Sequence, residues 1–241
     1  MKLLYERHGM AIPQLMRDMA IYFIQFRPYQ RRTLYCRLVD DLARIGLLSR
    51  TIFSTLNYEC VLEFSMAEAG ILLSYFDAGN ENTCPVWKLH GSSNFFSAQV
   101  QASPGVFYST GVVFEGGIQA FPDINRVIGH CLLETALAPV MCLYMEGKPV
   151  SISPSVIQRV QEMWKDAVAR AKAIFCIGVY PLEADDHIWS PIAKTQADLF
   201  FIGDKAAFDD WGERNRRGQS AYLGARFHEG YTKLTERISK I

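Results

Sequence analysis

Two short apolar runs place the strongest limit on how this 241-residue chain folds. Ile174-Phe175-Cys176-Ile177 and Leu199-Phe200-Phe201-Ile202 contain no polar side chain, so neither alternates between an apolar and a polar face. Strands of parallel sheets that helices cover on both sides have this pattern. The segment from Ser153 to Ala171, just before the first run, carries apolar residues at helical spacing after a Ser-Pro helix start. This alternation predicts an α/β fold, a three-layer arrangement of Rossmann type around a parallel sheet.

Two polar residues follow predicted strands in the first half of the chain. Asn57 follows the β-branched and aromatic run Thr51–Thr55, and His90 follows the apolar run Val86–Leu89. The carboxyl ends of strands are where α/β folds keep their binding and catalytic groups. We therefore predict a site there, although the residues alone also allow a loop-capping His90 and an Asx-turn at Asn57.

Three motifs around these residues resemble the signatures of bacterial sirtuin-like domains. The first, Thr55-Leu56-Asn57-Tyr58-Glu59 followed by Leu62-Glu63, is similar to Thr-Thr-Asn-Tyr-Asp…Leu-Glu. The second, Lys88-Leu89-His90-Gly91-Ser92, resembles the family's histidine motif. The third, at 177–188, is similar to a strand that ends in Ile-Gly-Tyr-Ser-Leu before an Asp and a His-Ile pair. The motifs occur in family order and cover residues 48–204.

The resemblance implies a Rossmann-like, sirtuin-like fold and cleavage of the bond between nicotinamide and ribose in NAD, with NAD as the substrate. It implies that His90 acts as the base and that Asn57 holds the ribose or the attacking water through its amide. Gly178 matches the family's glycine beside the cofactor, whereas Asp204 is equally open to a ribose contact or a turn. The full set of expected cofactor-binding residues is Thr55, Gly91, Ser92, Gly178 and Asp204.

The sequence departs from the family pattern at its amino terminus. Family members begin with a strand and Gly-Ala-Gly-x-Ser, whose backbone amides receive the pyrophosphate at a helix N-terminus. Nothing before Leu48 matches this pattern, because Met1–Tyr5 is followed by Glu-Arg-His-Gly. We therefore expect an amino-truncated product, a rebuilt sheet, or a strand supplied by a partner. Val179-Tyr180-Pro181 also lacks the hydroxyl of the usual Tyr-Ser-Leu.

The cysteines argue against zinc. None of the six occurs as Cys-x-x-Cys and most lie in apolar surroundings, which is typical of reduced core residues in a cytosolic protein. Such a chain cannot build the four-cysteine zinc ribbon of classical sirtuin deacylases, so we expect no zinc and rank protein deacylation last. Glu183–His187 offers carboxylates and an imidazole, but Asp185 or Asp186 is more simply a helix N-cap, and we predict no metal site.

Charge and hydropathy give no sign of two further classes of partner. The 25 basic and 25 acidic residues cancel without long runs of either sign, so no nucleic-acid footprint is evident, and only a local patch stays open. No apolar run reaches the length of a membrane span, and the amino terminus lacks a signal-peptide pattern. We predict a cytoplasmic protein without membrane contact, and leave open a homo-oligomer or a protein partner.

We predict one domain over residues 1–241. It has a helical amino-terminal segment (1–47), a small irregular insertion or flap (92–121) and a peripheral, helical carboxyl-terminal segment (205–241). Other predicted elements are helices from Pro13 to Phe26, from Tyr29 to Ile45, from Glu59 to Leu73 and from Phe121 toward Glu134, and a strand over 140–144.

Two functional hypotheses from different classes follow. The first is an NAD hydrolase, which in related bacterial systems depletes NAD during phage defence. The second is a catalytically silent sirtuin-like module that binds a nucleotide or serves in protein interaction. The missing glycine-rich loop favours the second hypothesis, and the retention of Asn57 and His90 favours the first, which we adopt.

Overall fold

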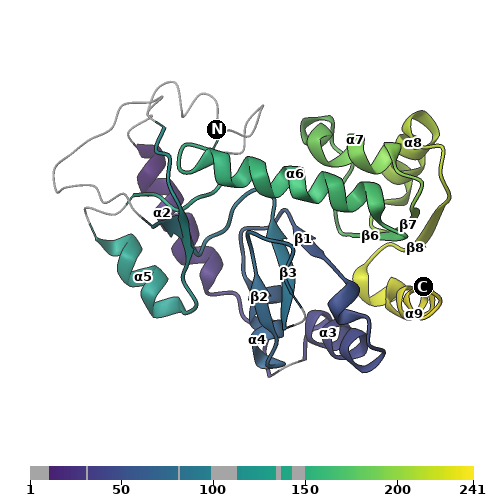
Figure 1. Cartoon of the computed structure of the whole chain (residues 1–241), viewed down its shortest axis with the longest axis horizontal. Coiled ribbons are helices and arrows are strands. Elements are labelled where there is room, and N and C mark those ends of the chain that lie inside the picture. The colour runs from purple at the N-terminus through teal and green to yellow at the C-terminus, as the bar shows by residue number, and fades with distance from the viewer. Residues whose placement is uncertain (1–10, 31, 81, 99–112, 134–136, 143–149) are drawn as a thin grey trace. The chain divides into compact units, whose positions relative to one another are not determined.

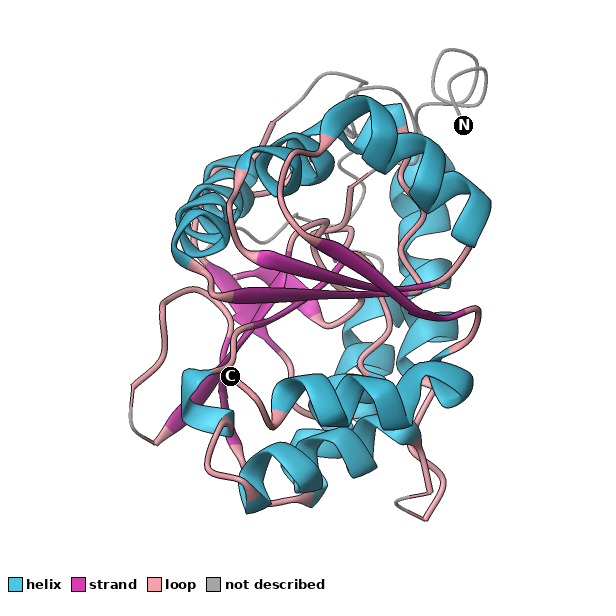
Figure 2. Ribbon diagram, turned by 90° about the vertical axis from the view of Figure 1, so that its right-hand side faces the viewer, coloured by secondary structure: helices cyan, strands magenta, loops and turns pink. Residues whose placement is uncertain are grey.

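The computed structural model describes residues 11–30, 32–80, 82–98, 113–133, 137–142 and 150–241. The chain divides into two compact units, the first made of Met1–Asp40 and Gly46–Gln161, the second of Asp41–Ile45 and Glu162–Ile241 (Figure 1). Both units combine helices with parallel strands, so the predicted α/β class is confirmed (Figure 2). The grouping of residues 1–241 into one domain stays a prediction.

The first unit contains a three-stranded parallel sheet. Its strands β1 (Phe53–Thr55), β2 (Leu72–Ser74) and β3 (Thr83–Lys88) lie in the order β1-β3-β2. The central strand β3 is buried from Cys84 onward, as its apolar sequence requires. Thr55 pairs with Lys88, so β1 and β3 end at the same level. The loops that follow these two strands therefore leave the same edge of the sheet.

Helix α4 (Val61–Glu68) connects β1 to β2 and is shorter than predicted. The sequence favoured one helix from Glu59 to Leu73, but the last three of these residues turn into the strand β2 and its approach. Gly70 has a φ of +75°, a conformation that ends helices and that only glycine adopts readily. The apolar residues after it then join the sheet instead of continuing the helix.

The amino-terminal segment contains α2 (Ile12–Ile24) and α3 (Leu34–Arg44), and η2 (Leu48–Arg50) follows. Helix α3 begins later than the predicted Tyr29. Gln30, with a φ of 47°, lies in the left-handed region, so the chain cannot become helical there. Residues 1–10, including the Met1–Tyr5 run, lie outside the described residues.

The predicted insertion contains an antiparallel pair, β4 (Phe95–Ser97) with β5 (Ile118–Ala120), which is separate from the parallel sheet. Residues 99–112 of this insertion lie outside the described part. Helix α5 (Ile124–Leu132) follows as predicted, and the carboxylate of Asp123 caps it by accepting a hydrogen bond from the Arg126 amide at 2.8 Å. Of the strand predicted at 140–144, only 140–142 is described, and Met141 forms an isolated bridge with Gly91.

The second unit has its own parallel sheet, in the order β6-β7-β8. The two apolar runs form β6 (Ala173–Ile177) and β7 (Asp198–Ile202), which confirms both predicted strands. The central β7 is buried from Leu199 to Ile202, whereas most of β6, at the edge of the sheet, is half-buried. β8 (Ser220–Gly224) lies in the segment predicted to be peripheral and helical, so that prediction is wrong for these residues.

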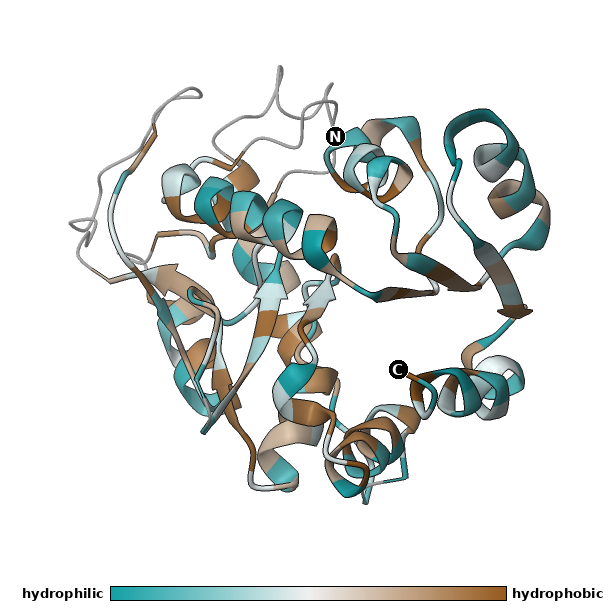
Figure 3. Cartoon of the chain, turned by 45° about the vertical axis from the view of Figure 1, so that its right-hand side comes forward, coloured by the Kyte–Doolittle hydropathy of each residue, from teal (hydrophilic) through white to brown (hydrophobic). Residues whose placement is uncertain are grey.

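The remaining helices are α6 (Pro154–Arg170), η3 (Glu183–Asp185), α7 (Asp186–Lys194), α8 (Lys205–Asn215) and α9 (Phe227–Ile238). They mix hydrophilic and hydrophobic residues, whereas β6 and β7 are mostly hydrophobic (Figure 3). α6 begins at Pro154 as predicted, but the Ser153 hydroxyl is buried without a partner among the described residues, so it does not cap the helix. Among the helices that the structure describes, none has the length and apolarity to span a bilayer.

Arg216 ties together the loops at one end of the second unit. Its guanidinium donates to backbone carbonyls near the end of α7 and beside the strands β7 and β8, a geometry that suits its planar fork of donors. The acceptors are the carbonyls of Ile192, Thr195, Ala197 and Gln219, and the Ser220 hydroxyl accepts a further bond at 3.0 Å.

Candidate functional site

The loops that carry Asn57 and His90 lie next to each other at one edge of the sheet in the first unit. Thr55 and Lys88 are paired at the ends of β1 and β3, and Asn57 and His90 each follow their strand end by two residues. The Leu89 amide extends the pairing by donating to the Thr55 carbonyl at 3.2 Å. The predicted juxtaposition of these two loops is therefore found. The side chains differ in their surroundings, since Asn57 is exposed and His90 is buried.

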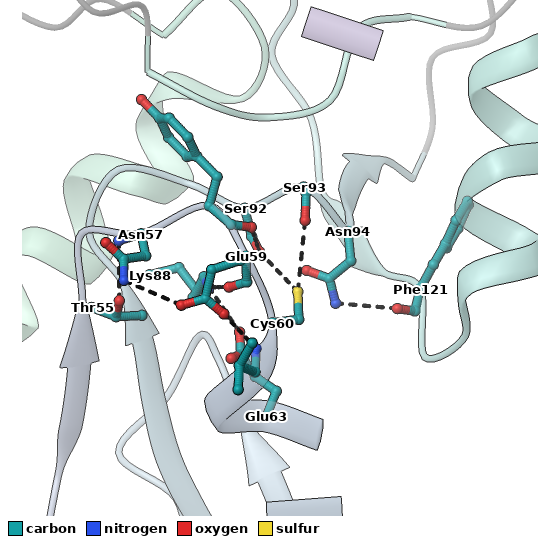
Figure 4. A network of polar contacts seen from close by, with 12 residues as sticks. Thr55, Asn57, Glu59, Cys60, Glu63, Lys88, Ser92, Ser93, Asn94 and Phe121 are labelled. Atoms are coloured by element: carbon teal, nitrogen blue, oxygen red, sulfur yellow. Dashed lines mark hydrogen bonds and ion pairs between the residues drawn. The ribbon is translucent and has the colours of Figure 1, made fainter. Parts of the chain in front are cut away.

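The turn that carries Asn57 is built by its neighbours. The Thr55 hydroxyl accepts a hydrogen bond from the Asn57 backbone amide at 3.0 Å, so this predicted cofactor-binding residue shapes the turn. The Asn57 side chain donates through Nδ2 to Oε1 of Glu59 at 3.1 Å (Figure 4). This contact between side chains replaces the Asx-turn that the sequence left open.

The turn after His90 depends on a close approach between backbone segments. Gly91 has a φ of +77°, and its amide donates to the Lys88 carbonyl at 3.1 Å. A Cβ at this position would overlap the carbonyl of Val140, so only glycine fits. The Ser92 amide donates to that same Val140 carbonyl at 2.9 Å. Both residues thus shape the loop, and their contact with a cofactor stays a prediction.

A buried ion pair lies beneath these two loops and was not predicted. Lys88 Nζ is 2.9 Å from Oε1 of Glu63, and the two side chains are 0% and 4% exposed. Neither Glu63 oxygen accepts a hydrogen bond of good angular geometry from a described residue, so the attraction between the charges is the main contact. Lys88 Nζ also donates to the Glu59 carbonyl at 2.5 Å.

The charge of Lys88 is maintained by its surroundings. Burial alone would lower the pKa of Lys88, but the opposite charge of Glu63, the contact with Glu63 and the charge of Glu59 together raise it above its ordinary value. Lys88 therefore stays an ammonium ion at neutral pH although no part of its side chain reaches solvent.

Cys60 lies between this ion pair and the serines that follow His90. Its Sγ is 3.6 Å from the Ser92 hydroxyl and 3.7 Å from the Ser93 hydroxyl. Burial, and then the charge of Glu63, raises the pKa of the Cys60 thiol to about 11. A thiol that stays protonated is a poor nucleophile, so Cys60 contributes packing rather than covalent chemistry. All six cysteines are buried and none forms a disulfide.

Gly178 and Asp204 belong to the second unit. They follow the neighbouring parallel strands β6 and β7, and the Gly178 amide donates to the Ile202 carbonyl at 2.8 Å. Asp204 caps α8, because its Oδ1 accepts a hydrogen bond from the Ala207 amide at 3.0 Å. Asp185 occupies the N-cap position of α7, but no hydrogen bond to its side chain caps the helix. That Gly178 and Asp204 bind the same ligand as Asn57 and His90 stays a prediction.

A scan against models of protein families finds no match for this sequence, and a search of curated proteins finds none either. The likeness to sirtuin-like domains therefore depends on the three motifs alone.

Proposed function

We propose that this chain is a sirtuin-like, Rossmann-type NAD-binding domain that hydrolyses NAD to nicotinamide and ADP-ribose. The observation that carries the proposal is that Asn57 and His90 lie at the same edge of a parallel sheet. Each residue follows the end of its strand by two positions, and the ends of β1 and β3 are paired with each other. Open α/β sheets bind their ligands at the carboxyl ends of such strands.

In the proposed reaction the bond between ribose C1′ and the nicotinamide nitrogen breaks, and the oxygen of a water molecule bonds to C1′. The bonding electrons leave with nicotinamide, which becomes neutral, and the proton released from water passes to His90 and then to solvent. An imidazole can accept and release a proton near neutral pH, which suits a general base. Its buried position favours this chemistry by excluding bulk water around the reacting atoms.

Asn57 has the complementary role of orientation. Its side chain is exposed, so it is accessible to a ligand, while its Nδ2 is already bound by Glu59. The amide oxygen is then the group that accepts a hydrogen bond from a ribose hydroxyl or from the attacking water. Fixing the reactants in this way supplies a large part of the rate in reactions of this kind.

The test is NAD turnover by the purified chain, with nicotinamide and ADP-ribose separated by chromatography. We expect release of both products by the wild type and its loss in Asn57→Ala and in His90→Gln. Because His90 is buried, the unfolding midpoint of each variant must be measured alongside. Asn82→Ala and His228→Ala, at exposed positions, are matched controls that should retain wild-type turnover.

The outcomes separate the two functional hypotheses. Turnover that both site variants lose while remaining folded supports the hydrolase. A wild type that releases no nicotinamide at millimolar NAD overturns it. Calorimetry then distinguishes a silent nucleotide-binding module, whose binding of NAD gives a measurable heat, from a chain that does not bind NAD.

A further inference from the structure

The carboxylate of Glu59 joins the Asn57 side chain to the beginning of α4. Its Oε1 accepts from Asn57 Nδ2 at 3.1 Å (Figure 4). Its Oε2 accepts from the Val61 amide at 2.5 Å. An ionised carboxylate can only accept hydrogen bonds, so it must face the nitrogen of the asparagine amide and not the oxygen. Glu59 therefore determines which of the two atoms of the Asn57 amide, nitrogen or oxygen, faces the carboxylate.

The backbone of Glu59 is itself fixed by a buried side chain. Its backbone carbonyl accepts a hydrogen bond from the buried ammonium of Lys88, and Lys88 is paired with Glu63 in α4. The backbone of Glu59 is thus tied to the last residue of β3, the strand that leads to His90. The Val61 contact fixes the carboxylate as well, because it satisfies one of the free amides at the start of α4.

We propose that Glu59 is a positioning residue that orients the Asn57 amide with its oxygen toward the ligand. Its effect on catalysis rests on the proposed NAD hydrolysis, but the orientation itself does not. Glu59 acts through Asn57, since its Oε1 accepts the hydrogen bond from the Asn57 amide and its Oε2 is held by the Val61 amide.

Glu59→Gln is the sharpest variant because it keeps the size of the side chain. Its amide oxygen can still accept from Val61, but its NH₂ group then faces Asn57 and donates instead of accepting. The Asn57 amide must turn over to meet it, which presents nitrogen to the ligand. We expect kcat to fall about a hundredfold, the scale of loss that small misplacements cause, with little change in KM or in the unfolding midpoint.

A double-mutant cycle tests whether Glu59 acts through Asn57. If it does, Glu59→Gln has no further effect in the Asn57→Ala background. Independent losses that multiply in the double variant would overturn the proposal. Where Asn57→Ala leaves no measurable turnover, the spectroscopic measurement of the Asn57 amide described below is the deciding test. Glu68→Gln makes the same substitution at an exposed position at the end of α4 and should leave turnover unchanged.

A measurement without NAD distinguishes failure of this inference from failure of the proposed function. In a ¹H–¹⁵N spectrum the side-chain amide of Asn57 is identified by its absence in Asn57→Ala. We expect its resonances to shift and its protons to exchange faster in Glu59→Gln, and to stay in place in Glu68→Gln. Unchanged resonances in Glu59→Gln would overturn the positioning role. Shifted resonances in a chain without NAD turnover would support the positioning role and count against the hydrolase.

Discussion

Lys88 and Glu63 form an ion pair of 2.9 Å that is closed off from solvent on both sides, with side chains 0% and 4% exposed. Lys88 comes from the end of the central strand β3, and Glu63 comes from the first turn of α4. Taking two such charges out of water is costly, so the pair adds little net stability while it is intact, and its disruption is expensive.

Removing one partner should therefore destabilise the protein strongly. We expect Lys88→Met to lower the free energy of unfolding by about 3–5 kcal/mol, because the Glu63 carboxylate is left buried without a counter-charge. The double variant Lys88→Met/Glu63→Leu should recover most of this loss, as measured by urea denaturation. Lys205→Met, which breaks the exposed pair with Asp209, is the control and should leave the free energy of unfolding close to that of wild type. A double variant as unstable as the single one would contradict this account.

Gly91→Ala should damage the loop that carries His90. A Cβ would overlap the Val140 carbonyl and would lie on a residue with a φ of +77°, so the loop must move. We expect a loss of at least about 2 kcal/mol in unfolding free energy. Gly129→Ala in α5 is the matched control, since a Cβ there has open space, and it should stabilise the helix by about 0.5–1 kcal/mol. A Gly91→Ala variant as stable as wild type would show that the approach to Val140 is not tight.

Arg216→Lys should destabilise the second unit although it preserves the charge. An ammonium group cannot reproduce the planar fork that reaches the carbonyls of Ile192, Thr195 and Ala197. We expect a loss of about 2 kcal/mol, since some of these carbonyls then lack a donor. Arg214→Lys, two residues earlier in an exposed pair, should stay within about 0.5 kcal/mol of wild type. Equal effects of the two substitutions would refute a special role for Arg216.

His130 should make stability depend on pH. It lies edge-on to the rings of Phe96 and Phe121, with centroid distances of 4.5 and 5.2 Å. Burial, and then the positive charge of Arg126, lowers its pKa below the ordinary value. The unfolded chain binds the proton more tightly, so this contribution is fully present above about pH 6.5 and is lost as the pH falls toward the lowered pKa.

We therefore expect the unfolding free energy to fall more steeply between about pH 7 and pH 5 in wild type than in His130→Gln. Urea titrations across this range measure the slopes. His228→Gln changes an imidazole on the surface of α9 and should leave the wild-type slope intact. If His130→Gln has the same slope as wild type, the neutral form of His130 is not favoured by folding.

The strands with the strongest hydrophobic signal could be predicted from the sequence. β6 and β7 are uninterrupted apolar runs, and β1 is rich in β-branched and aromatic residues. β2 was missed because its leucines also continue the apolar pattern of α4, and only Gly70 marks the change. β8 was missed because its sequence is mixed and only Leu223 is fully buried. Weak strands of this kind acquire their structure from the neighbour they pair with.

The site was predictable only where it follows strand ends. Asn57 and His90 stand directly after apolar runs, so their place at the sheet edge could be inferred. The contacts of Glu59 and Glu63 could not, because Lys88 is more than twenty residues away in sequence and only the packing of α4 on β3 brings them together. The one available signal was Lys88 itself, a charge within an otherwise apolar run, since such a charge requires a buried partner.

The buried pair also limits which alternative structures this sequence can adopt. Side chains alternate along a strand, so a slip of β3 by one residue would turn Lys88 to the opposite face of the sheet, away from Glu63. Both charges would then be buried without a counter-ion, which no rearrangement of apolar side chains can offset. The ion pair therefore favours one pairing register of β1 and β3, with α4 packed in one position, because the alternatives leave its charges unpaired. That register places Asn57 beside the His90 loop.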